Sequence, residues 1–307
     1  MLCAVLLGLL LCQGAAAASD AVELAFKFAP GDVVKHEVSV SGGGHLRSSQ
    51  GQMSPIGVRG TLSMVYTTRE VLADGRGRVE ARMTKASLDV DVGEENARLL
   101  YENGRLRWFA NGQEHAPPEA DLSQLPLMGT PVVLTMSPAG QVSEVALADP
   151  RVLGALQQAL PGINLGQFRG ASDGLFPEGP VNVGETWRRS AVVTPVGPLM
   201  PVTVTTSHTL DSYSEEGEIG VAKISGYSEA RLQWRPTTVS PGGTEVTVGI
   251  PEFRETVTST EFFNTSEGRL LRGDYEVAFT TRVSVQAGEE EREGQAEARF
   301  HIFVQAR

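Results

Sequence analysis

Phe176-Pro177-Glu178-Gly179-Pro180-Val181-Asn182-Val183-Gly184-Glu185-Thr186-Trp187 is the stretch around which the sequence is organised, because a shorter version of it lies near the start of the chain. Gly31-Asp32-Val33-Val34-Lys35 and Gly184-Glu185-Thr186-Trp187-Arg188 each combine a glycine, an acid, two strand-forming residues and a base. An alternating run follows each of them. We interpret these two segments as the openings of two copies of one β-module.

Two further turns occur in the same order in both halves of the sequence. The turn at 73–77 corresponds to the turn at 214–217, and the segment at 135–142 resembles the segment at 263–270. Turns converge easily, but three matches in one order favour a duplication. The sequence therefore predicts a mainly β fold with long curved antiparallel sheets. Two related modules of open or half-barrel type, at 19–147 and 181–307, are joined by one short helix and a Gly/Pro-rich connector at 148–180.

The N-terminal segment predicts export. Residues 1–18 carry no charge, contain an apolar run from Leu2 to Cys12, and end in small residues typical of a signal-peptide cleavage site between Ala18 and Ser19. This run is too short for a permanent transmembrane helix. A rival interpretation makes Cys12 a lipidated residue, but Leu11 stands where a lipoprotein signal needs a small residue. We therefore expect a periplasmic or extracellular protein without a lipid anchor.

Composition narrows the classes of partner. Both cysteines of the chain, Cys3 and Cys12, lie within the predicted signal peptide, so the mature chain has neither a disulfide nor a thiol nucleophile. The formal net charge of −11 argues against nucleic acid and against an anionic membrane surface as main partners. The predicted partners are a lipid or another hydrophobic small molecule, or an envelope protein.

Alternating patterns predict strands along most of the chain. The clearest runs from Leu271 to Val285, with apolar residues at odd positions and polar residues at even positions. Glycine and proline predict a mobile loop at 42–60, a second loop at 236–249 and a turn at 289–294. Apolar residues occupy odd positions from Val79 to Met83 but even positions from Leu88 to Val92. This change of phase predicts a bulge or bend at Lys85 to Ser87.

Two local signals are stronger than the rest. Asn103-Gly104 and Asn111-Gly112 are typical of tight hairpin turns, because these residues tolerate the positive φ angles of a type I′ turn. Asp149 and Pro150 begin a predicted helix that carries an apolar stripe to Leu160 and ends at a Pro-Gly pair.

No pattern in the sequence indicates a catalytic centre, a metal site or a cofactor. The histidines lack the spacing of metal ligands and are His36, His45, His115, His208 and His301. The acids lie mostly in predicted turns, and neither a nucleophile elbow nor a phosphate loop is present. We therefore predict that the protein is not an enzyme.

The three tryptophans are the candidate ligand contacts. Trp108, Trp187 and Trp234 all lie on predicted strands, where wide aromatic rings can line an apolar pocket. The same rings more often fill a core. Both interpretations stay open from the sequence.

Val181-Asn182-Val183-Gly184-Glu185-Thr186-Trp187, followed later by a Gly268-Arg269-Leu270 hairpin, resembles an uncharacterised family of exported bacterial β-rich proteins. Members of that family share a Val-x-Val-Gly-[Asp/Glu]-x-Trp element after a short helix, and many look like lipoproteins. The family has no catalytic site to carry over. The predicted architecture also resembles the half-barrel of periplasmic lipoprotein carriers, which is a likeness of fold alone.

Three functional hypotheses follow in order of preference. The first is a non-enzymatic envelope protein that binds a lipid-like ligand in a curved sheet, and the second is a structural or interaction module whose sheets are filled by their own side chains. The third is an envelope hydrolase. An open apolar cavity distinguishes the first from the second, and a convergent polar cluster with shifted pKa values favours the third.

Overall fold

The computed structural model describes residues 21–115, 130–147, 174–193, 202–239, 246–287 and 290–307. Most of these residues form strands of one large antiparallel sheet, and none of them belongs to a helix. The prediction of a mainly β fold with an open curved sheet is therefore confirmed. The predicted helix from Asp149 to Leu160 lies outside the described residues.

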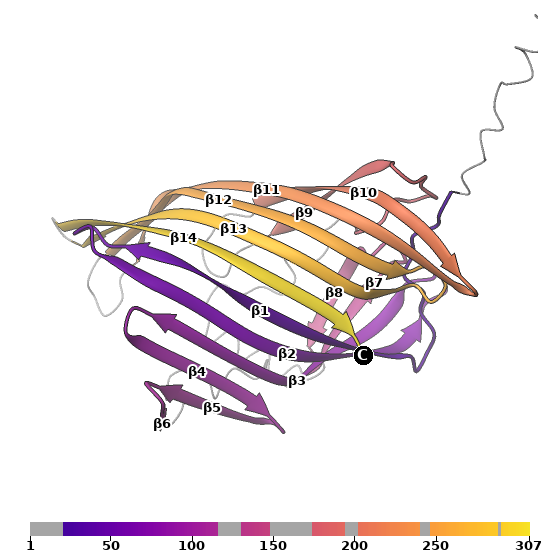
Figure 1. Cartoon of the computed structure of the whole chain (residues 1–307), viewed down its shortest axis with the longest axis horizontal. Helices are drawn as coiled ribbons and strands as arrows, with labels where there is room; N and C mark the ends of the chain where they lie inside the picture. The colour runs from indigo at the N-terminus through magenta and orange to yellow at the C-terminus, as the bar shows by residue number, and fades with distance from the viewer. Residues whose placement is uncertain (1–20, 116–129, 148–173, 194–201, 240–245, 288–289) are drawn as a thin grey trace, which may run out of the picture.

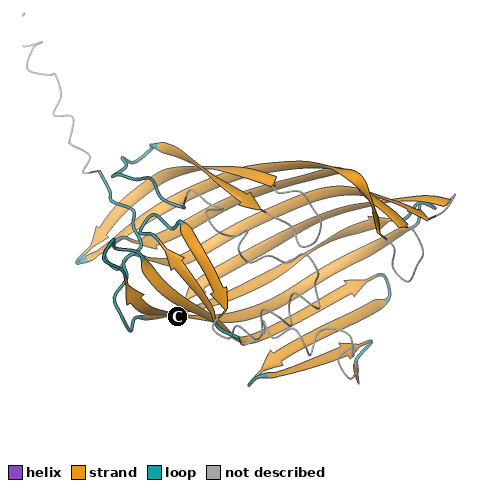
Figure 2. Ribbon diagram, turned by 180° about the vertical axis from the view of Figure 1, so that it is seen from behind, coloured by secondary structure: helices purple, strands orange, loops and turns teal. Residues whose placement is uncertain are grey.

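The strands are β1 (Val33–Arg47), β2 (Met53–Val71), β3 (Gly77–Val92), β4 (Glu95–Glu102), β5 (Arg105–Ala110), β6 (Gln113–His115), β7 (Val132–Met136), β8 (Val142–Leu147), β9 (Thr186–Val193), β10 (Val202–Glu216), β11 (Ile219–Val239), β12 (Val246–Asn264), β13 (Arg269–Ala287) and β14 (Glu290–Ala306). Their order in the sheet is β6-β5-β4-β3-β2-β1-β14-β13-β12-β11-β10-β9. β7 pairs with the first half of β3, β4 pairs with its second half, and β8 pairs with β7. Figure 1 shows the sheet as a long arch, with β7 and β8 beneath the end that holds the C-terminus; Figure 2 shows the same arrangement from behind.

Several local predictions are confirmed by the backbone. Asn103 and Gly104 form the turn between β4 and β5 with φ angles of 53° and 75°. The predicted bulge in β3 lies at Thr84, one residue before the predicted range, because Ser63 pairs with Lys85 while the next residue of β2 pairs with Met83. Gly140 forms the β7–β8 turn with a φ of 83°.

The predicted mobile loop at 42–60 is wrong. Gly42, Gly43 and Gly44 lie inside β1, and β2 begins at Met53. A Cβ atom on any of the three glycines would lie well under 3.0 Å from the backbone of β14 or β2. Glycine is therefore needed here because neighbouring strands approach too closely for a side chain, and not because the strand ends.

Two other loop predictions are wrong in part. β11 continues through Pro236 to Val239, and β12 begins at Val246, so only 240–245 of the predicted loop lies outside the strands and outside the described residues. The predicted turn at 289–294 is mostly strand, since β14 begins at Glu290. Register shifts after Leu232 and Trp234 let this irregular stretch stay in the sheet.

The compact core lies at one end of the sheet, on the face that we call the inner face. Leu210, Ile224 and Phe263 are almost completely buried on it. The segments that cover them are residues 21–28 and 174–181, which pair with each other through Val22 and Val181. Three phenylalanine rings pack together where these segments meet the sheet: the ring of Phe26 lies 5.1 Å from that of Phe176 and 5.5 Å from that of Phe263.

The outer face carries most of the ion pairs. Lys223 lies 3.5 Å from Asp211, Arg231 lies 2.7 Å from Glu229, and many similar pairs occur along the sheet with partly exposed side chains. Surface pairs contribute about 0 to 1 kcal/mol each to stability, so they mainly keep this face in water. On β13 the polar even positions lie on this face, where Asp274 pairs with His301 and Arg282 lies 3.5 Å from Glu252, so the alternation predicted for β13 is confirmed.

The two predicted modules join in one continuous sheet through the β1–β14 pairing, and their strand orders correspond. The neighbours β8-β7-β3-β2-β1 match β13-β12-β11-β10-β9, and β4 to β6 and β14 have no counterpart. Gly31 donates its N–H to the carbonyl of Thr68 over 2.8 Å, as Gly184 does to Leu210 over 2.7 Å. These correspondences support the duplication, which stays a prediction that superposition of the two backbones can test.

Candidate functional site

The inner face is apolar far beyond the compact core. Its side chains follow from the cross-strand register: Val304 faces Val38, which faces Leu62, and Val277 faces Phe300. Further apolar residues on it include Val40, Met64, Leu88, Val90, Leu99, Leu106, Val257, Phe279 and Ile302. Most of these side chains are half-buried, and Leu46, Leu88 and Val92 are 36 to 37% exposed. One mostly apolar surface therefore extends across many strands. It includes an acid, Glu255, which faces Phe279 and whose pKa burial raises.

Three stacked rings lie in the middle of this surface. Phe279 lies 6.5 Å from Phe253 and 5.8 Å from Phe300, with interplanar angles of 20° and 16°. The rings come from β12, β13 and β14, where alternation places each of them on the inner face. Flat aromatic surface of this kind is suited to contact with apolar chains.

The three candidate tryptophans do not form one wall. Trp187 is 9% exposed, stacks on His208 at 5.6 Å and donates its Nε1–H to the carbonyl of Leu175 over 3.0 Å, so it belongs to the compact core. Trp108 is half-buried on β5, near the opposite edge of the sheet. Trp234 lies on β11 beside Ile250. The sequence could not show this separation, because it depends on sheet order.

Sequence reasoning missed a group of polar side chains on the inner face, which we call the polar cluster. It consists of His208, Ser259, Glu261 and Tyr275. His208 of β10 faces Gly226 of β11, which faces Ser259 of β12, which faces Tyr275 of β13. Glu261 is 5% exposed and accepts a hydrogen bond from the hydroxyl of Tyr275. The sequence signal that could have revealed this cluster is Glu261, an acid at an odd position of β12 on the same face as Val257 and Phe263.

Burial disfavours the charged forms of the titratable groups in the polar cluster. Burial, with a smaller contribution from the charge of Arg189, lowers the pKa of His208 to about 4. Burial also raises the pKa of Glu261, although the hydrogen bond from Tyr275 opposes this shift. Burial raises the pKa of Tyr275 as well, and the neighbouring Glu261 adds to that shift. Each shift favours the neutral form of its group.

The polar cluster is not arranged as a Ser-His-acid triad. His208 Nδ1 is buried and has no hydrogen-bond partner, so Ser259 is not bonded to it. Glu261 is bonded to Tyr275. A triad needs both bonds to the histidine, and the geometry therefore gives no support to nucleophilic catalysis.

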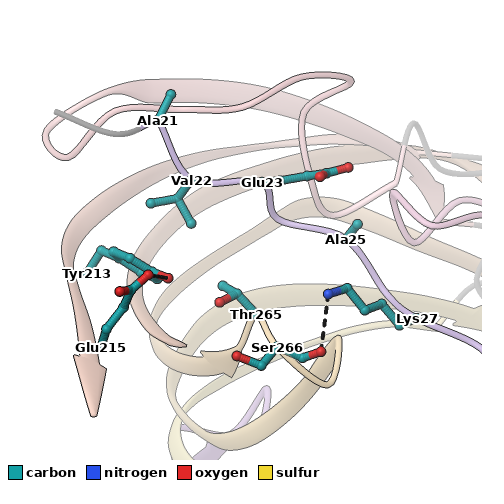
Figure 3. Close-up of a pocket in the computed structure, with 9 residues that line it drawn as sticks. All are labelled: Ala21, Val22, Glu23, Ala25, Lys27, Tyr213, Glu215, Thr265 and Ser266. Carbon is teal, nitrogen blue, oxygen red and sulfur yellow. Dashed lines mark hydrogen bonds between the residues drawn. The ribbon is translucent and has the colours of Figure 1, made fainter. Parts of the chain in front are cut away.

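Two depressions lie away from the polar cluster. One of about 300 Å³ lies between the N-terminal segment and the β10–β11 and β12–β13 turns. In Figure 3 Tyr213 and Glu215 lie together on one side of it, and Lys27 donates to the carbonyl of Ser266 on the other. The other, of about 550 Å³, is lined mainly by outer-face residues such as Arg254 and Thr256. Both have mixed polar and apolar linings, so neither is an apolar cavity.

In the described part of the chain, no group of three or more His, Cys, Asp or Glu side chains is placed to hold a metal ion. The same residues include no helix with the length and hydropathy that crossing a membrane requires.

The fold and the site define an open, arched antiparallel sheet with a charged outer face and an apolar inner face. No family model matches the sequence, and no curated protein matches it. Among solved structures the chain is similar to the crystal structure of Pseudomonas aeruginosa OpdQ. The two are 5% identical, the match covers 90% of this chain and 99% of that one, and the TM-score is 0.20. A TM-score this low is not evidence of a shared fold or function.

Proposed function

We propose that this protein is a non-enzymatic envelope protein that binds a lipid-like hydrophobic ligand on the inner face of its sheet. The observation that carries the proposal is the extent of the apolar inner face. It spans the strands from β5 to β12, whereas the compact core occupies one end.

An apolar sheet face of this size needs a cover. Sheets bury their apolar face against another layer, and contiguous exposed apolar surface marks binding sites. Each methylene that moves from water onto such a face contributes about 0.8 kcal/mol, so about ten buried methylenes contribute about 8 kcal/mol before the cost of association. The half-buried side chains around Phe279 are suited to such a chain.

The predicted location agrees with this proposal. The apolar N-terminal run and the cleavage site at Ala18 support export, and a carrier of hydrophobic molecules is useful where these must cross an aqueous compartment. The sequence-based alternative, an interaction module with a filled core, predicts instead that the inner face takes no small ligand.

Two measurements test the proposal. Mass spectrometry of the protein purified from its native host should find a hydrophobic molecule in near-stoichiometric amount. After delipidation, the neutral fluorophore N-phenyl-1-naphthylamine should bind saturably. Absence of both a co-purified lipid and saturable binding would show that the inner face is filled by the chain itself.

A pair of charge insertions locates the binding surface. Leu88→Glu places a carboxylate on the inner face, at a side chain that is already 36% exposed, and should reduce fluorophore binding at least about tenfold. Thr61→Glu places the same charge on the exposed outer side of β2 and should leave binding unchanged. Equal effects of the two substitutions would place the fluorophore elsewhere.

A further inference from the structure

We infer that the polar cluster is the binding site for the uncharged head group, a hydroxyl or an ester carbonyl, of a neutral amphipathic lipid. The inference rests on the proposed function, because the apolar chain of that lipid would lie on the inner face. It adds the chemical class of the ligand and its orientation.

The first reason is an unsatisfied atom. His208 is 5% exposed, and its Nδ1 has no hydrogen-bond partner. A buried polar atom without a partner costs about 1 to 3 kcal/mol, and such atoms are rare in folded proteins. A ligand hydroxyl can donate to or accept from this nitrogen, whichever tautomer is present.

The second reason is the convergence of two polar atoms beside Gly226. Gly226 lies between His208 and Ser259 in the sheet. A Cβ atom at position 226 would lie 3.4 Å from His208 Nδ1 and well under 3.0 Å from Ser259 Oγ. Both polar atoms therefore turn toward the same point, which a side chain on β11 would block. Glycine in a strand interior often marks such a close approach.

The third reason is charge. His208 is neutral at physiological pH, and Glu261 is buried and bonded to Tyr275. Arg189, whose charge acts on His208, donates two hydrogen bonds to the carbonyl of Phe176, at 3.0 and 2.6 Å. An anionic head group would have to lose its hydration beside the carboxyl group of Glu261, while the guanidinium of Arg189 is held by the carbonyl of Phe176. The site therefore suits a group that forms hydrogen bonds but carries no charge.

The fourth reason is position. Tyr275 is followed on the same face by Val277 and then by Phe279 of the stacked rings, while on the other side of the cluster Phe263 belongs to the compact core. The polar cluster thus lies where the closed end of the inner face meets its apolar middle. A lipid whose head group bonds to the cluster would extend its chain over the stacked rings.

Displacement of N-phenyl-1-naphthylamine by three ligands with the same chain length tests the inference. These are 1-monooleoylglycerol, oleate at pH 7.4 and 1-octadecene. The wild-type protein should bind monooleoylglycerol about tenfold more tightly than octadecene, and more tightly than oleate. Loss of one such hydrogen bond corresponds to about a tenfold change in affinity.

Two substitutions remove the predicted contacts. His208→Phe keeps a ring against Trp187 but lacks Nδ1, and Ser259→Ala removes the hydroxyl. Each should reduce monooleoylglycerol affinity about tenfold and leave octadecene affinity unchanged. Thr206→Val, one position further along the same face of β10, is the matched control and should change neither. If His208→Phe does not fold, Ser259→Ala decides.

A spectroscopic measurement complements the affinities. The ¹⁵N resonance of His208 Nδ1 should shift when monooleoylglycerol is added and stay unchanged with octadecene. Equal affinity of both variants and wild type for monooleoylglycerol, or a wild type that prefers oleate, overturns the head-group site while the proposed function stands. If the wild type binds none of the ligands, the proposed function fails as well.

Discussion

Replacing Trp187 by alanine should lower the free energy of unfolding by about 3 to 5 kcal/mol. The indole ring is 9% exposed and lies against His208, with an interplanar angle of 19°, so truncation leaves a cavity beside a buried imidazole. It also leaves the carbonyl of Leu175 without the Nε1–H that it accepts over 3.0 Å. The loss of this bond alone accounts for about 1 kcal/mol.

Urea unfolding followed by far-ultraviolet circular dichroism measures these effects without relying on tryptophan fluorescence. Trp187→Phe separates the two contributions, because it keeps most of the apolar contact and should cost only about 1 to 2 kcal/mol. Trp108→Ala is the matched control, since that ring is half-buried on β5 and should cost clearly less than Trp187→Ala. A cost below about 0.5 kcal/mol for Trp187→Ala, a value typical of surface substitutions, would refute a buried ring and a core at this end of the sheet.

Three other outcomes are expected. Gly44→Ala should destabilise the protein by about 3 kcal/mol in thermal unfolding, because its Cβ would overlap the carbonyl oxygen of Glu297, whereas Gly179→Ala, with open space around it, should be nearly neutral. Between pH 6.5 and about 4 the unfolded chain protonates His208 and the folded protein does not, so acidification should destabilise wild type by up to about 3 kcal/mol relative to His208→Phe; parallel stability curves would contradict this. Intact-mass measurement of the exported protein should show a chain that begins at Ser19 without a lipid, and a mature N-terminus at Cys12 with acyl groups would reverse the assignment.

The features that the sequence predicted correctly are those set by neighbours along the chain. Asn103-Gly104 specifies its turn because only two backbone angles matter, and the alternation in β13 specifies two faces because side chains in a strand point alternately to opposite sides. The bulge at Thr84 is local as well, since a single extra residue reverses the phase of the pattern.

The features that it missed depend on strands that lie far apart in the sequence. Gly42 to Gly44 look like a loop until β14 and β2 approach them from both sides. His208 and Tyr275 are 67 positions apart in the chain but belong to one row across four strands, which sheet order alone reveals. Each of these residues taken alone is unremarkable in its own strand.

The position of the compact core determines how the rest of the sheet can be stabilised. β12 and β13 each have 19 residues, which at about 3.3 Å per residue gives roughly 60 Å, yet the core includes only Phe263 from β12, near the end of that strand. Most of the length of these strands therefore lies beyond the core. Its inner-face side chains, which are mainly apolar on β13 and include Glu255, Ser259 and Glu261 on β12, meet whatever covers the inner face. If that cover is a ligand, its binding free energy adds to folding stability in proportion to the logarithm of ligand concentration. The stability of the delipidated protein should then rise with added lipid, whereas a face filled by the chain itself has no such dependence.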